Sequence, residues 1–219
     1  MAILLNGTSE GIVYSASGNI FTSVMSMGCW FYPTDSQANT ALMWTYRLIG
    51  THEHRIRTDA GGTNKIAAEY ESTTGVQTIV SSNTWTTNAW NHVWAYFDPS
   101  GAAMTIFLNG AMTNGSPLAR TIGAAGKLSV GSNRNAANWF AGRIAEPFVM
   151  DNTGGPVSTD RLYQGVPVNE CPGREGLVFW ARLLGANMRD LVDKSGVSGP
   201  VPPTPADHPR QLGHYRRVA

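Results

Sequence analysis

The sequence predicts an all-β protein built as a sandwich of two antiparallel sheets. Charged residues make up only 14% of the chain while glycine occurs 24 times, a composition typical of short strands joined by many turns. Apolar or alternating runs recur along the chain, and clusters of Gly, Pro, Asn, Asp and Ser separate them. At 219 residues the chain is long enough for a single large β-domain.

The opening strands lie in residues 2–35, with a short run at Ile12–Tyr14 and a longer one from Val24 to Tyr32. With a period of two, one face of the longer run is wholly apolar and carries Met25, Met27, Cys29 and Phe31. The other face is mixed but uncharged, so we expect a central strand that Pro33 ends.

Four more β-runs follow, over residues 41–49, 55–59, 65–70 and 76–80. The last two are typical of a hairpin with polar outward positions. Alternation would place His52 and His54 on one face and Glu53 on the other. No third metal ligand is spaced nearby, so the sequence favours a solvated turn at His52–His54 over a metal site.

The clearest hairpin joins residues 93–97 to 104–108 through Asp98-Pro99-Ser100-Gly101, a turn whose Pro presets φ and whose Gly permits positive φ. Asn109-Gly110 then predicts a type I′ reversal. Further β-runs are expected at residues 128–131, 140–150 and 177–181.

The order of motifs from Trp90 to Met150 resembles the LamG-like jelly rolls of the concanavalin A-like lectin/glucanase superfamily. The motifs are Trp90-Asn91-His92-Val93, Met104-Thr105-Ile106-Phe107-Leu108-Asn109-Gly110, Leu128-Ser129-Val130-Gly131-Ser132 and Phe140-Ala141-Gly142-Arg143-Ile144-Ala145-Glu146. The resemblance covers about residues 3–155. It implies a concanavalin A-like jelly roll, a structural role for His92, and a short segment after the last strand. Residues 156–164 are the only plausible helix before Gly165.

The resemblance also shows where an enzyme of this superfamily would carry its carboxylates. Such enzymes hydrolyse glycosides with carboxylates at alternating positions of one strand, as in Glu-x-Asp-x-x-Glu. This sequence has no such motif, and only Glu69 and Glu71 have strand spacing, in a hairpin where we expect them to be exposed. Neither a Gly-x-Ser-x-Gly elbow nor a phosphate-binding Gly loop occurs. The sequence therefore predicts that the protein is not an enzyme.

The loop from Ser132 to Trp139 is the candidate ligand site. Amide and guanidinium groups beside an aromatic ring are typical of sugar binding, and the loop offers Asn133, Arg134, Asn135 and Trp139. The alternative is a polar connector whose Trp139 caps the core. Trp44, Tyr46 and Arg47 could form a second platform, or simply pack.

We expect no cofactor. Some LamG domains bind calcium at the rim, and Asp59, Asp98 or Asp151 could serve here, although none lies in an acidic loop. Cys29 and Cys171 are predicted to be buried free thiols, because two cysteines do not make a disulfide framework.

The chain changes character at Ser195, where hydrophobic periodicity stops and five prolines fall between Pro200 and Pro209. We predict a sandwich domain over 1–194 and an extended arm over 195–219, suited to docking on a neighbouring subunit. The residues assigned to this assembly arm are Pro200, Pro202, Pro203, Arg210, Tyr215, Arg216 and Arg217.

The last part of the chain resembles phage-encoded LamG-like proteins in Leu183-Leu184-Gly185, Ser195-Gly196 and Ala206-Asp207-His208-Pro209. The net charge of +1 excludes a broad field for nucleic acid or anionic membrane, and no apolar run of 18 residues could span a bilayer. No signal peptide is evident, so we expect synthesis in the host cytoplasm.

We therefore expect a non-enzymatic structural protein of a bacteriophage virion, and we favour a capsid decoration or cement protein that bridges neighbouring subunits. Its partners would be other virion proteins and copies of itself. The alternative is a lectin-like tail or surface adsorption protein that binds a cell-surface glycan.

Overall fold

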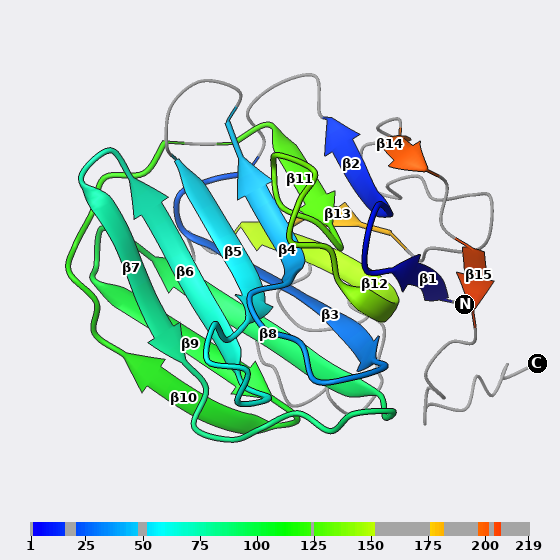
Figure 1. Cartoon of the computed structure of the whole chain (residues 1–219). Helices are drawn as coiled ribbons and strands as arrows, with labels where there is room; N and C mark the ends of the chain where they lie inside the picture. Colours follow the sequence, from blue (N-terminus) through cyan, green and yellow to red (C-terminus); the bar gives the residue numbers. More distant parts are fainter. Residues whose placement is uncertain are drawn as a thin grey trace, which may run out of the picture.

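The computed structural model shows two antiparallel β-sheets packed face to face (Figure 1). It describes residues 2–15, 21–47, 52–123, 125–151, 176–181, 197–201 and 204–206. The predicted all-β sandwich is confirmed, and every regular element among the described residues is a strand.

The first sheet, sheet A, has the strand order β10-β9-β8-β3-β12-β1-β15, and β13 also pairs with β12. Its strands are β1 (Ala2–Asn6), β3 (Met25–Pro33), β8 (Asn91–Asp98), β9 (Ala103–Leu108), β10 (Ala111–Gly115), β12 (Ala141–Asp151), β13 (Leu177–Trp180) and β15 (Thr204–Ala206). As predicted, β3 is a central strand, with β8 on one side and β12 on the other.

The second sheet, sheet B, has the order β14-β2-β11-β4-β5-β6-β7. Its strands are β2 (Gly11–Ser15), β4 (Ala41–Tyr46), β5 (Glu53–Thr58), β6 (Ile66–Ser72), β7 (Gly75–Val80), β11 (Lys127–Val130) and β14 (Val197–Val201). The predicted hairpin of β6 and β7 is present, with Tyr70 opposite Gln77. The outer face of this sheet is turned toward the viewer in Figure 1.

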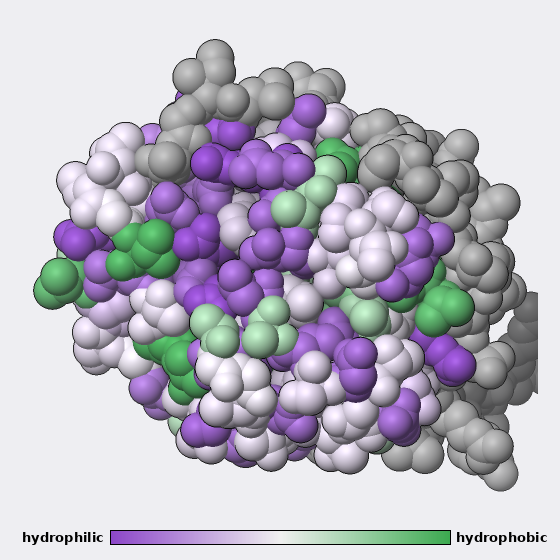
Figure 2. All heavy atoms as spheres, in the orientation of Figure 1, coloured by the Kyte–Doolittle hydropathy of each residue, from purple (hydrophilic) through white to green (hydrophobic). Residues whose placement is uncertain are grey.

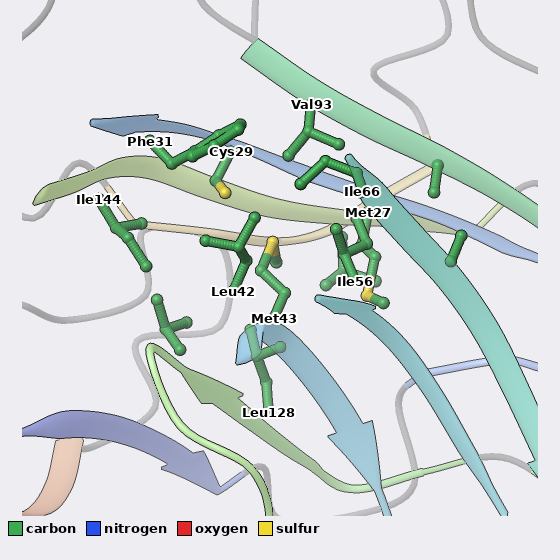
Figure 3. Packing of buried hydrophobic residues seen from close by; sticks show 14 of the residues in the cluster. Met27, Cys29, Phe31, Leu42, Met43, Ile56, Ile66, Val93, Leu128 and Ile144 are labelled. Atoms are coloured by element: carbon green, nitrogen blue, oxygen red, sulfur yellow. The ribbon is translucent and has the colours of Figure 1, made fainter. Parts of the chain in front are cut away.

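The core lies between the two sheets and is built from the alternating apolar positions of both. Met27, Cys29 and Phe31 of β3 point from sheet A toward Leu42 and Ile56 of sheet B (Figure 3). All five are completely buried, so the apolar face predicted for β3 is confirmed. Cys29 is a free thiol, as expected, and burial raises its pKa far above the usual value; Cys171 lies outside the described residues.

A second apolar cluster, formed by residues of β8, β12 and β13, covers part of the outer face of sheet A. The cluster consists of Trp94, Phe148, Met150 and Trp180, all buried. His92 lies beside it, with its ring 4.9 Å from that of Trp30. Burial lowers the pKa of His92 to about 3, so the ring is neutral at physiological pH. This is the structural role that the family resemblance implied.

Two local predictions about turns have different outcomes. At the type I′ reversal both Asn109 and Gly110 have positive φ, 52° and 82°, as the sequence predicted. In the turn between β8 and β9 the residue with positive φ is Ala102, at 55°, and not Gly101. Asp98 explains the difference, because its carboxylate accepts a 2.7 Å hydrogen bond from the Gly101 backbone N–H and holds the preceding turn.

Two short segments of the predicted arm pair with strands of the same chain. β14 pairs with β2, and β15 pairs with β1, on the right of Figure 1. Of the assembly residues only Pro200, in β14, lies within the described residues. The predicted helix at 156–164 and the boundary at 194 fall outside them. A bridging role for the arm stays a prediction.

Candidate functional site

Polar and charged side chains gather on the outer face of sheet B, over β4, β5 and β11 (Figure 2). The alternation of side chains along a strand explains why these groups share one face. In β5, His54 and Ile56 point into the sandwich, so Glu53, Arg55 and Arg57 point outward. The antiparallel register then places Arg55 directly opposite Glu69 and Glu53 opposite Glu71 on β6.

Glu69 is the centre of an ion-pair network on this face. Its carboxylate is paired with the guanidinium groups of Arg55 and Arg57, and it accepts a 3.0 Å hydrogen bond from the hydroxyl of Thr78 on β7. Arg55 also contacts Glu71, at 2.9 Å. Burial alone would raise the pKa of Glu69. The hydrogen bond from Arg57 and the positive charges of both arginines outweigh it, so the pKa lies below its usual value.

Glu53 occupies the neighbouring position and is only 1% exposed. It accepts a 2.8 Å hydrogen bond from the indole N–H of Trp44, whose ring lies 4.6 Å from the guanidinium carbon of Arg55. Arg55 and Arg134 both pair with its carboxylate. Burial outweighs these favourable contacts and raises the pKa of Glu53 above the usual range. The two buried glutamates of this face are thus shifted in opposite directions.

The candidate glycan loop meets this network through Arg134. Asn133 shapes the loop, because its side-chain oxygen accepts hydrogen bonds from the backbone N–H groups of Asn135 (2.9 Å) and Ala137 (3.0 Å). Arg134 then reaches back to Glu53 on β5 and keeps 33% of its side chain exposed. The sequence named Arg134 as a candidate, but the partner it finds on the sheet was not predicted.

The other predicted site residues take separate places. Asn135 is exposed at the tip of the loop. Trp139 is half-buried and does not belong to the core clusters. Its ring lies so close to Gly11 that a Cβ at this position would be 3.0 Å from it. Trp44 and Tyr46 do share the outer face of β4, but both are buried. Arg47 does not lie in this cluster, and its guanidinium lies close to Gly123.

Two expectations about acidic and histidine residues were wrong. His52–His54 is not a solvated turn: Glu53 and His54 belong to β5, where pairing with β4 and β6 on both sides buries them. Glu69 is not exposed either, since two arginines cover it. The Nε2 of His54 lies 3.0 Å from the backbone oxygen of Ser23, at hydrogen-bond distance. Its ring lies 5.2 Å from that of Phe97, and burial lowers its pKa to about 4.

Two of the three calcium candidates act as turn residues, and the third, Asp151, is the last residue of β12. Asp59 accepts a 3.0 Å hydrogen bond from the hydroxyl of Thr63. Asp98 accepts a 2.9 Å hydrogen bond from the hydroxyl of Ser100. Within the described part of the chain, no group of three or more His, Cys, Asp or Glu residues is arranged to hold a metal ion.

Residues 6–153 match the Laminin_G_3 family, which is described as the concanavalin A-like lectin/glucanases superfamily. The chain belongs to this superfamily. The match spans the region in which the sequence showed the resemblance, and it includes both the loop with Arg134 and the strands that carry Glu53 and Glu69. No curated protein sequence matches the chain.

Solved structures show the same superfamily fold at low sequence identity. A heptameric SAP-like pentraxin from Limulus polyphemus is 12% identical, with 90% of this chain and 93% of that chain covered and a TM-score of 0.59. The CBM40 domain of a Ruminococcus gnavus sialidase, bound to α2,3-sialyllactose, is 15% identical, covering 74% and 94%, with a TM-score of 0.56.

A third similar structure is tailspike protein 2 of the Escherichia coli O157:H7 bacteriophage CAB120. It is 15% identical with a TM-score of 0.55, and 83% of this chain matches 26% of that much longer chain. At these identities the likeness concerns the fold alone. In the described ranges of the chain, no helix is long and apolar enough to cross a membrane.

Proposed function

We propose that this protein is a non-enzymatic carbohydrate-binding module whose ligand lies on the outer face of sheet B, beside Arg134. One observation carries the proposal: Arg134, from a loop whose composition is typical of sugar binding, is held by Glu53 on the polar face of the sheet. A guanidinium fixed in this way loses little further freedom when a ligand binds.

The chemistry of the face suits a ligand rich in hydroxyl groups. Arg134 is one-third exposed, Glu71 is 22% exposed, and Asn135, the loop residue after Arg134, is exposed, so both donors and acceptors are available. Three arginines and three glutamates meet here, and their formal charges cancel. The face therefore offers many hydrogen-bonding groups with no excess charge.

The same contacts argue against glycoside hydrolysis. A hydrolase needs one carboxyl group free to give a proton and a second free to attack the sugar or activate water. Both oxygens of Glu69 are occupied by arginines and Thr78, and Glu53 is held by Trp44, Arg55 and Arg134. With their oxygens engaged in this way, neither carboxyl group is free to attack a sugar or to activate water.

Known relatives of the fold support binding as a function. The CBM40 structure carries a sialylated sugar, which shows that the fold can be used to hold a glycan. For this chain we expect the face, whose charges cancel, to favour a neutral glycan chain.

A glycan array followed by calorimetry on the best ligand tests the proposal. We expect Arg134→Ala to weaken binding by about tenfold or more, which corresponds to the loss of one charge-assisted hydrogen bond. The matched control is Arg143→Ala, because Arg143 lies on the other sheet, 4.9 Å from the ring of Tyr32. Glycan binding that survives both Arg134→Ala and Trp139→Ala, or no binding to any glycan, would contradict the proposal.

A second candidate function is structural, as a component of a bacteriophage virion and in particular a capsid decoration or cement protein. The phage-like motifs from Leu183 to Pro209 favour it, and a tailspike shares the fold. In this setting the glycan-binding face would serve adsorption, and the arm or another surface would serve assembly. Mass spectrometry of particles purified from a lysate of the host that encodes the chain tests it. The protein should copurify with particles in a fixed ratio to the capsid subunit, and its absence from them would rule this function out.

A further inference from the structure

Among the described residues, the edge strands of the two sheets are protected very unequally. On one side of the sandwich the edges are β14 and β15, and each contains a proline, Pro200 and Pro205 (Figure 1). Proline offers no backbone N–H, so such strands do not readily accept another strand. The arm thus closes both edges on that side.

On the opposite side, β7 ends sheet B without any such protection. Its sequence, Gly-Val-Gln-Thr-Ile-Val, has neither a charge nor a proline. Val76 is 40% exposed and Val80 38%, and Figure 2 shows apolar side chains along this edge. Leu118 contacts β7 through the side chain of Gln77, its N–H donating at 3.0 Å, and not through the backbone of the strand. Among the described strands, only β6 pairs with β7.

The hairpin register shows which backbone groups of β7 point outward. Ser72 pairs with Gly75 across a two-residue turn, so alternate residues after it turn their N–H and C=O groups away from β6. These residues are Val76, Thr78 and Val80. Their side chains lie on the outer face of the sheet, since Thr78 reaches Glu69 there.

We propose that β7 pairs with β7 of a second copy of this chain, antiparallel, about a two-fold axis at Thr78. Thr78 then faces Thr78 of the second copy, and Val76 faces its Val80. The three facing pairs make about six main-chain hydrogen bonds, and the two copies of sheet B become one continuous sheet. The symmetric spacing of the two valines about Thr78 makes the edge complementary to itself, as a two-fold interface requires.

The charges near this edge do not oppose the pairing. Glu69 and Glu71 lie on the adjacent strand, and Arg55 and Arg57 neutralise them within the same molecule. No like charges therefore face each other across the axis. The inference deepens the assembly role considered above by naming a partner and a surface, and it does not depend on glycan binding.

Light scattering of the full chain over a series of concentrations tests the inference. We expect a mass twice the 23.6 kDa of the chain. Val80→Lys should shift the protein to the monomer at concentrations where the unaltered chain is a dimer. Thr78→Pro should do the same without breaking the sheet, because the lost N–H points away from β6.

Leu4→Lys is the matched control, since Leu4 is as exposed as Val80, at 38%, but lies on β1. Circular dichroism and glycan binding check that each variant is folded. Two results would overturn the inference: a monomer at every concentration, or an oligomer that persists in both Val80→Lys and Thr78→Pro. In either case a glycan titration that still depends on Arg134 would leave the proposed function standing.

Discussion

Replacing the two buried glutamates of sheet B, Glu69 and Glu53, by glutamine should lower the stability of the protein by very different amounts. Glu69→Gln removes the carboxylate that Arg55 and Arg57 share, while both guanidinium groups stay in place at 12–13% exposure. Breaking a buried ion pair from one side costs about 3 kcal/mol, because a charge is left without its partner. For a chain of this size, that loss lowers the melting temperature by about 6–12 °C.

Glu53→Gln should cost much less, about 0–1 kcal/mol. Burial already disfavours the ionised form of Glu53, as its raised pKa indicates. Glutamine keeps an oxygen that can accept the hydrogen bond from the indole N–H of Trp44. What it loses is mainly the pairing with Arg134, which is partly exposed and therefore screened by water.

Urea unfolding of both variants at pH 7, followed by tryptophan fluorescence, measures how much each substitution lowers the free energy of unfolding. Acid titration gives a second readout. The pKa of Glu69 is lowered on folding, so its contribution is present above the usual value of 4.5 and lost as the pH falls through the lowered value. The loss of stability below pH 4.5 should therefore be shallower in Glu69→Gln. Equal losses in both variants at pH 7 would refute the reasoning.

Three further predictions concern the rest of the sandwich. The pKa of His92 is lowered from 6.5 to about 3, so this group costs about 1.4 kcal/mol of stability for each pH unit below 6.5. His92→Phe should therefore make the free energy of unfolding depend less steeply on pH between pH 6.5 and 4. An unchanged slope would count against this prediction. Ala102 has φ of 55°, so Ala102→Gly should stabilise the protein by about 0.5–1 kcal/mol in thermal unfolding, whereas Ala119→Gly, whose φ is not positive, should not. The hydroxyl of Ser26 is buried with no hydrogen-bond partner among the described residues. Ser26→Ala should therefore leave the stability unchanged or raise it by about 1 kcal/mol. A loss of more than about 1 kcal/mol in urea unfolding would show that the hydroxyl has a partner.

The fold was predictable because its strongest signals are local. The apolar face of β3 follows from alternation within nine residues, and the reversal at Asn109-Gly110 follows from two residues that tolerate positive φ. The polar face of sheet B was harder to predict. In the sequence, Glu69 looks like an exposed strand residue, because nothing near it shows that β5 will bring Arg55 and Arg57 alongside.

The site could be predicted in part for the same reason. Composition alone marked the loop with Arg134 and Asn135, since amides and a guanidinium stand together in the sequence. The partner of Arg134 is Glu53, on a strand from the other half of the domain, and only the fold brings the two together. The alternation Glu53-x-Arg55-x-Arg57 was the one available signal that these side chains share a face.

The two proposals reinforce each other geometrically. A two-fold axis that pairs β7 with a second β7 must stand perpendicular to the shared sheet, because Thr78 presents its side chain on the same face in both copies. The Arg134 loops of the two copies then lie on one side of the dimer, which can bind two glycans of one surface at once. Val80→Lys should therefore weaken binding to an immobilised glycan layer by about 100-fold or more while the affinity for the soluble sugar stays unchanged. Equal binding to the layer by the unaltered chain and the variant would mean that the two copies do not present their sites together.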